Sequence, residues 1–103
     1  MIAENSLAFA ITDGFPVTPL HTLIIPRRHV ADYFDLFTSE ERALQQLLRE
    51  TRSAILQQDR TVSAFNVGIN AGAAARQTIS HCHVHLIPRR DGDTPNPRGG
   101  VRV

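Results

Sequence analysis

The sequence lacks the residues on which several classes of protein depend. Cys82 is the only cysteine, so neither an internal disulfide nor a four-cysteine zinc site can form. The chain has no tryptophan, and none of its apolar runs approaches the roughly 20 residues of a membrane span. The formal net charge of +1 gives no case for a nucleic-acid or membrane partner. Because residues 1–6 lack the basic segment of a signal peptide, we expect a cytoplasmic protein.

The composition is ordinary for one small domain. Hydrophobic residues make up 42% of the 103 residues and charged residues 20%. A core of this size contributes modest stability, so pairing with a second copy would be a natural supplement. After Pro88 the sequence turns to glycine, proline and charged residues. We therefore expect a single domain over residues 1–90 and an irregular tail over residues 91–103.

Periodic patterns divide this domain into strands and one long helix. Alternating apolar residues predict strands over residues 7–12, 21–25, 63–70 and 81–88. Apolar residues at helical spacing predict a helix over residues 39–58, and Thr38 with Glu41 has the spacing of a capping box at its start. A weaker pattern over residues 30–36 indicates a short helical turn. The long helix is expected to cover one face of the sheet.

The histidine-rich stretch over residues 81–88 is the centre of the predicted chemistry. Successive side chains of a strand point to opposite faces, so His81, His83 and His85 would share one face. Neighbouring imidazoles would then stand roughly 6–7 Å apart. One strand would thus present three groups that exchange protons near neutral pH.

Three interpretations of this histidine face compete. The first is that these are half-buried polar side chains with no chemical role. The second is a zinc site, since two histidines at alternate positions can bind one ion and His21 or Asp13 could supply a third ligand. The third is nucleophilic catalysis at phosphorus, in which one imidazole attacks and its neighbours set its tautomer and charge.

The surrounding residues favour catalysis at phosphorus. The loop before the histidines offers hydrogen-bond donors from Gln77 and Thr78, and Asn70 is predicted on the histidine face of its own strand. No acidic residue lies between Asp59 and Asp91, whereas many catalytic metal sites include a carboxylate. A setting so poor in acidic residues suits a bound anion better than a bound cation.

The stretch His81-Cys82-His83-Val84-His85-Leu86-Ile87 resembles the histidine-triad (HIT) motif, in which single hydrophobic residues separate three histidines. The resemblance continues through residues 9–13, 21–26 and 96–102, and the last of these is similar to the tail of a bacterial and archaeal branch. Within the HIT superfamily the chain resembles the dinucleoside polyphosphate hydrolases of the fragile-histidine-triad-like branch. The resemblance implies an α+β homodimer, each subunit having an antiparallel sheet of about five strands covered by one long helix, plus a short helix.

The resemblance also implies a reaction and a role for each site residue. HIT proteins bind nucleotides and cleave at the α-phosphorus through a nucleotidyl-histidine, which water then hydrolyses. By position, His83 would be the nucleophile and His85 would hydrogen-bond the phosphate. His81 would fix the ring of His83, with help from the region of His21. The resemblance implies contacts for six further residues. Thr78 would contact the leaving group, Gln77 and Asn70 the phosphate, Asp13 the ribose, and Ile11 and Leu23 a purine base.

The resemblance leaves the substrate and the metal requirement open. Purine nucleoside phosphoramidate hydrolysis is the alternative to dinucleoside polyphosphate hydrolysis, and a nucleotide-binding regulatory protein with little turnover is a third possibility. Relatives in this branch often begin with a CxxC zinc segment, which is absent here, so we expect no structural metal. The only metal we expect is Mg²⁺, as a counter-ion of the substrate.

Two positions depart from the pattern of the family. Many relatives have a glycine immediately before His21, where this chain has Leu20. If that glycine has a positive φ, Leu20 is strained or the turn is altered. Many relatives also have a glycine before Gln77, where this chain has Arg76. The arginine either reaches a polyphosphate or distorts the loop that places Gln77 and Thr78.

Overall fold

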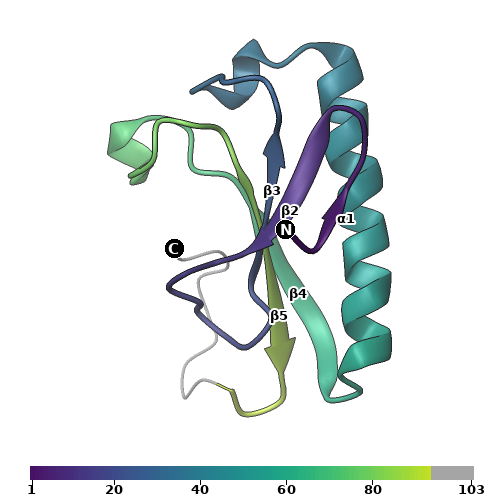
Figure 1. Cartoon of the computed structure of the whole chain (residues 1–103). Coiled ribbons are helices and arrows are strands. Elements are labelled where there is room, and N and C mark those ends of the chain that lie inside the picture. Colours follow the sequence, from purple (N-terminus) through teal and green to yellow (C-terminus); the bar gives the residue numbers. More distant parts are fainter. Residues whose placement is uncertain (94–103) are drawn as a thin grey trace.

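The computed structural model describes residues 1–93. One antiparallel sheet of five strands forms a layer, and a single long helix covers one of its faces (Figure 1). The strand order is β1-β2-β3-β5-β4, with bounds β1 (Ala3–Glu4), β2 (Ala8–Thr12), β3 (Thr22–Pro26), β4 (Val62–Gly68) and β5 (Val84–Arg90). The helices are α1 (Thr38–Gln58) and two short 3-10 helices, η1 (Tyr33–Asp35) and η2 (Ala73–Ala75).

This architecture confirms the predicted α+β fold with five antiparallel strands and one long helix. A short helix also forms within the predicted range, as η1. The predicted tail lies, from residue 94 onward, outside the described residues. Within residues 1–93, no helix is long and apolar enough to cross a membrane.

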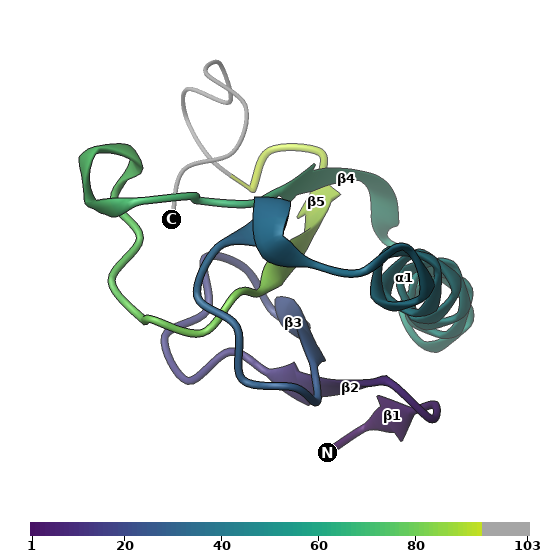
Figure 2. The same ribbon diagram turned by 90° about the horizontal axis from the view of Figure 1, so that it is seen from above.

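The core lies between α1 and the centre of the sheet. Leu44 and Leu47 of the helix pack against Ala10 and Ile24 of the sheet, and Leu47 and Ile24 are fully buried. Burying a leucine side chain contributes about 1.5–3 kcal/mol, so the apolar stripe of α1 is a main source of stability. Alanines on β2 leave room for the helix to approach the sheet closely. The opposite face of the sheet carries the loops before β3 and β5 (Figure 2).

The N-terminus of α1 differs from the predicted capping box. The helix begins at Thr38, and Glu40 rather than Glu41 folds back, so that its carboxylate accepts from the Phe37 N–H at 2.8 Å. Glu40 is only 4% exposed and also pairs with Arg28 at 2.8 Å. Glu40 rather than Glu41 takes this position because a buried carboxylate needs a charged partner, which Arg28 gives to Glu40 and which Glu41 would not have.

The predicted histidine strand is wrong at its start. β5 begins at Val84, so His81 and His83 precede the strand, and the three histidines do not share one strand face. The last residue pair between β3 and β5 is Ile24 with Val84. Two residues further along, β3 reaches Pro26, which has no N–H to donate to a ladder. Instead, the Cys82 N–H donates to the Val30 carbonyl at 2.7 Å, and the chain bends at the histidines.

Candidate active site

The sheet places His85 at the end of a row of facing residues. Ile11 pairs with Leu23, and Leu23 pairs with His85 on the neighbouring strand β5. On its other side His85 faces Gly68 of β4, which has no side chain. Ile24, the next residue of β3, packs in the core beneath α1, so this row lies on the face away from the helix.

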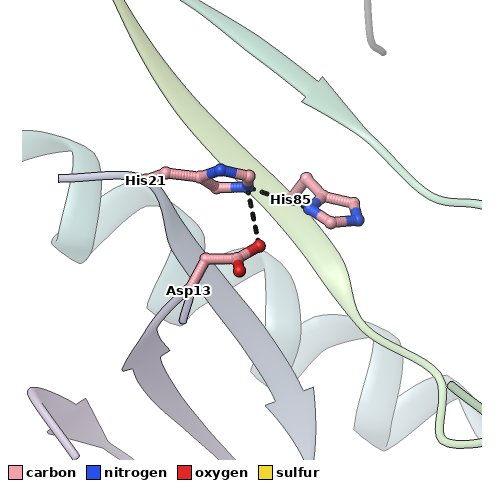
Figure 3. A group of neighbouring side chains, drawn as sticks. All are labelled: Asp13, His21 and His85. Atoms are coloured by element: carbon pink, nitrogen blue, oxygen red, sulfur yellow. Dashed lines mark hydrogen bonds and ion pairs between the residues drawn. The ribbon is translucent and has the colours of Figure 1, made fainter. Parts of the chain in front are cut away.

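A hydrogen-bonded chain fixes the tautomers of His21 and His85. The Val17 N–H donates to His21 Nδ1 at 3.0 Å. A neutral His21 must therefore have its proton on Nε2, which lies 3.0 Å from His85 Nδ1 and donates to it (Figure 3). His85 Nδ1 is then an acceptor, so the proton of the His85 ring is on Nε2. His85 can thus offer an N–H to an anion.

Burial keeps both rings neutral. Desolvation lowers the pKa of His21, and the Asp13 carboxylate, 3.4 Å from His21 Nε2, partly offsets this effect. Desolvation also lowers the pKa of His85 to about 4, with smaller contributions from His83 and His21. Their side chains are 0% and 5% exposed. At pH 7 the tautomers deduced for neutral rings therefore apply.

The backbone of His81, rather than its imidazole, holds the ring of His83. His83 Nδ1 lies 2.8 Å from the His81 carbonyl, which can only accept, so Nδ1 has the proton and Nε2 has a free lone pair. The His81 ring instead donates from Nε2 to the Pro26 carbonyl at 2.9 Å and stands against His29. Because of the bend, the ring centroids of His83 and His85 are 4.9 Å apart, closer than the spacing predicted for a straight strand.

His83 and His85 open into a cavity of about 340 Å³, within the range of small-molecule sites. Six residues assigned by the family resemblance line this cavity: Asp13, Leu23, Asn70, Thr78, His83 and His85. Four residues without an assigned contact complete the lining: Phe15, Val17, Arg76 and Ile79. Four assigned residues do not line it: Ile11, His21, Gln77 and His81. His21 affects the cavity by donating to His85, and His81 affects it through its backbone carbonyl, which accepts from His83.

Gln77, expected to contact the phosphate, has its side chain bound to the loop around it. Its Oε1 accepts from the Gly72 N–H at 2.7 Å. Its Nε2 donates to the carbonyls of Ala31 and Ile79 at 2.8 and 3.0 Å. The amide thus ties the loop after β4 to the segment after β3. A phosphate contact would require one of these hydrogen bonds to open.

Exposed apolar residues form the rim that sequence reasoning missed. Phe15 is 94% exposed and Ile79 is 54% exposed, and both line the cavity. The Phe15 N–H donates to Asp13 Oδ1 at 2.8 Å, which fixes the turn beside the predicted ribose contact. The available signal was the position of Phe15, an aromatic residue in a loop between Asp13 and Pro16.

The two departures from the family pattern both have left-handed backbones. Leu20 has φ 72° and Arg76 has φ 67°, and they are the non-glycine residues with positive φ within residues 1–93. Glycine adopts this conformation readily, whereas other L-residues are strained in it. Leu20 is therefore strained, as expected if a glycine with positive φ is replaced.

Asp13, His21 and His85 are the described residues whose ligand atoms lie close enough to hold a metal ion, all within 4.8 Å of one another. Their hydrogen bonds do not fit that use. A metal on His21 Nε2 would move the ring proton to Nδ1, where it would face the Val17 N–H. Two donors would then oppose each other in a buried site, so this arrangement suits a proton rather than a metal ion.

Comparison with known proteins shows the family to which the chain belongs. Residues 1–92 match the HIT domain family. A 16.1 kDa HIT-like protein of Mycoplasma pneumoniae is 36% identical over 88 residues, which are 85% of this chain and 60% of that protein. The asymmetrical bis(5'-nucleosyl)-tetraphosphatase of Schizosaccharomyces pombe is 38% identical over 98 residues, which cover 87% of this chain and 49% of that enzyme. A crystal structure of a zinc-bound histidine triad family protein from Mycobacterium smegmatis superposes with a TM-score of 0.84 at 33% identity, covering 94% of this chain and 70% of that one.

The fold and the histidine cluster thus define an α+β protein of the histidine-triad class. The chain belongs to the HIT domain family, which confirms the resemblance found in its sequence. It spans 60% of the Mycoplasma protein and about half of the yeast enzyme.

Proposed function

We propose that this chain is a nucleotide hydrolase that cleaves dinucleoside polyphosphates at the α-phosphorus through a nucleotidyl-histidine. The observation that carries the proposal is the contact between His83 Nδ1 and the His81 carbonyl. The His81 carbonyl accepts a hydrogen bond from His83 Nδ1–H, so the lone pair at Nε2 is available for attack. The similarity to the yeast tetraphosphatase supports polyphosphate as the substrate class.

In the first step, His83 Nε2 forms a bond to the α-phosphorus while the bond to the bridging oxygen of the leaving polyphosphate breaks. The His83 ring becomes cationic and keeps its Nδ1–H on the His81 carbonyl. The His85 Nε2–H would donate to a nonbridging oxygen on which negative charge develops. In the second step, water adds to phosphorus, the phosphorus–nitrogen bond breaks, and the neutral imidazole is regenerated as the proton of the water is released.

The two walls of the cavity suggest how the nucleotide would lie. Asp13 comes from the loop after β2, where its carboxylate oxygens could accept from ribose hydroxyls. Leu23 and the exposed ring of Phe15 would provide apolar contacts for a purine base. Thr78, from the loop before β5, would donate its hydroxyl to the leaving group. The phosphate then lies between the walls, beside His83 and His85.

The test is product analysis with diadenosine tetraphosphate and, separately, with an adenosine phosphoramidate. We expect AMP and ATP from the tetraphosphate and a protein mass increase of one adenylyl group during turnover. The matched variant is His83→Asn, whose side-chain N–H can still donate to the His81 carbonyl although it lacks the nucleophile. It should bind AMP but release no product. Full hydrolysis by His83→Asn would refute the assignment, and rapid cleavage of the phosphoramidate alone would favour the alternative substrate class.

We extend the proposal to a homodimer that needs no metal other than Mg²⁺ bound to the substrate. β4 is an edge strand of the described sheet, and Val67 on it is 47% exposed. An exposed apolar edge is a suitable surface for a second copy. Light scattering of the purified protein should give the mass of two chains, and a monomer at micromolar concentration would contradict this part.

A further inference from the structure

We propose that Arg76 is a specificity-determining residue whose guanidinium binds the leaving polyphosphate. The inference rests on the proposed function and deepens it, because it explains why this chain would favour polyphosphate over phosphoramidate substrates. It starts from the unusual backbone conformation of Arg76 and from its position in the cavity wall.

The backbone at Arg76 is fixed by the loop that surrounds it. Arg76 follows η2, and its N–H donates to the Ala73 carbonyl at 2.9 Å. The next N–H, of Gln77, donates to the Gly72 carbonyl at 3.1 Å. These bonds hold residue 76 at φ 67°, where a glycine would be free of strain.

Packing offsets such strain at Leu20 but not at Arg76. The side chain of Leu20 is partly buried against Ile55, Val62 and Leu86. Arg76 is exposed, and within residues 1–93 no hydrogen bond or ion pair holds its guanidinium. Strained residues that the fold does not need are found mainly at functional sites. The strain at Arg76 therefore points to a ligand.

The position of Arg76 identifies which part of the ligand it would meet. Arg76 lines the cavity with His83 and belongs to the same loop as Thr78, the predicted leaving-group contact. This loop and the loop of Asp13 lie on the sheet face opposite α1 (Figure 2). Asp13 is the acidic residue of the cavity lining and belongs to the other wall. The cation therefore stands on the leaving-group side.

Four other arginines of the described chain are already neutralised by carboxylates. The ion pairs are Arg27 with Glu4, Arg28 with Glu40, Arg89 with Asp93 and Arg90 with Asp59. Arg89 and Arg90, which the sequence also places near the histidines, are thus committed to structure. Arg76 combines a free guanidinium with a place in the cavity wall.

The chemistry of the leaving group makes the proposal specific. Cleavage of diadenosine tetraphosphate releases a group with several negatively charged phosphates, which an arginine can bind in a bidentate manner. Cleavage of a phosphoramidate releases an amine, which offers nothing to a guanidinium. Arg76 should therefore raise kcat/KM for polyphosphates only.

The experiment compares Arg76→Gly and Arg76→Asn with wild type on both substrates. Glycine and asparagine tolerate a positive φ but lack the cation. We expect kcat/KM for diadenosine tetraphosphate to fall about 10-fold to 100-fold, as for a lost hydrogen bond to a charged group, and that for the phosphoramidate to stay within twofold. The variants should be at least as resistant to urea as wild type, because strain is relieved. Arg60→Gln, which removes an exposed arginine after α1, is the control for net charge and should change neither value.

If wild type turns over both substrates, an equal loss on both, or no loss on either, would overturn the proposal. A binding measurement keeps the test independent of turnover. In the His83→Asn background, Arg76→Gly should weaken the affinity for diadenosine tetraphosphate about tenfold and leave the affinity for AMP unchanged. If wild type turns over neither substrate but this difference in binding remains, the proposed hydrolysis fails and the role of Arg76 stands. If the affinities for tetraphosphate and AMP fall equally, or neither affinity falls, the role of Arg76 is refuted.

Discussion

Lowering the pH should destabilise this fold through His85. In the folded protein burial lowers the pKa of His85 to about 4, whereas an unfolded histidine titrates at 6.5. Between these values the unfolded chain binds a proton that the folded chain does not, so stability rises with pH and is lost as the pH falls below 6.5. At pH 5 the two pKa values correspond to about 2 kcal/mol of lost unfolding free energy, relative to pH 7.5. His21, with a lowered pKa, adds a loss of the same sign.

Urea unfolding at pH 7.5 and pH 5 would measure this loss, and His85→Asn isolates its source. Asparagine does not titrate, and its side-chain oxygen can replace Nδ1 as the acceptor for His21. Between pH 7.5 and pH 5, the unfolding free energy of the variant should therefore fall by about 2 kcal/mol less than that of wild type. Asp59 and Asp93 do not interfere, because hydrogen bonds from Thr61 and Arg89, respectively, help lower the pKa of each to about 2. His29→Asn, at an exposed position, is the control. Equal losses in His85→Asn and wild type would refute the reasoning.

Two further predictions concern the loops that position the site. Gln77→Ala should lower kcat/KM about 10-fold to 100-fold on both polyphosphate and phosphoramidate, because the loop that places Thr78 loses its ties. Faster amide hydrogen exchange over residues 72–80 would accompany that loss, and unchanged exchange would argue for a direct phosphate contact instead. Leu20→Gly should change the unfolding free energy by less than about 1 kcal/mol, because relief of strain offsets the lost burial. Leu20→Ala keeps the strain and loses the burial, so urea unfolding should show it to be the less stable of the two.

The fold could be predicted from the sequence because its main signals are periodic. The apolar residues at helical spacing in α1 are buried as expected, with Leu44, Leu47 and Ile55 all below 5% exposure. The errors occur where a tertiary contact decides the local structure. Glu40 displaces Glu41 at the helix start because Arg28, twelve residues earlier, pairs with it. No pattern within the helix could reveal that partner.

The sequence indicates which residues lie around the cavity better than it indicates how their side chains are arranged. Alternation correctly places His85 on the cavity side of the sheet, but it also predicts the ring of His81 there, and that ring turns to the Pro26 carbonyl. The missing information was that β3 pairs with β5 only as far as Ile24, which leaves the Pro26 carbonyl available to accept from the His81 ring. The phosphate contact of Gln77 stays a prediction, because a long polar side chain can satisfy backbone groups of its own loop, as it does here, as well as a phosphate. Residue types alone cannot distinguish these partners.

The hydrogen bonds around His21 depend on the turn that contains the strained Leu20. The Val17 N–H can only donate, and this single amide sets the proton positions on His21 and then on His85. Val17 lies four residues before His21, so their contact requires the chain to turn back between them, and Leu20 at φ 72° makes part of that turn. Its side chain anchors the turn against Leu86, one residue beyond His85 on β5. The contact between Leu20 and Leu86 therefore joins the turn before His21 to the strand of His85, and a core contact that stabilises the turn also helps to orient the site.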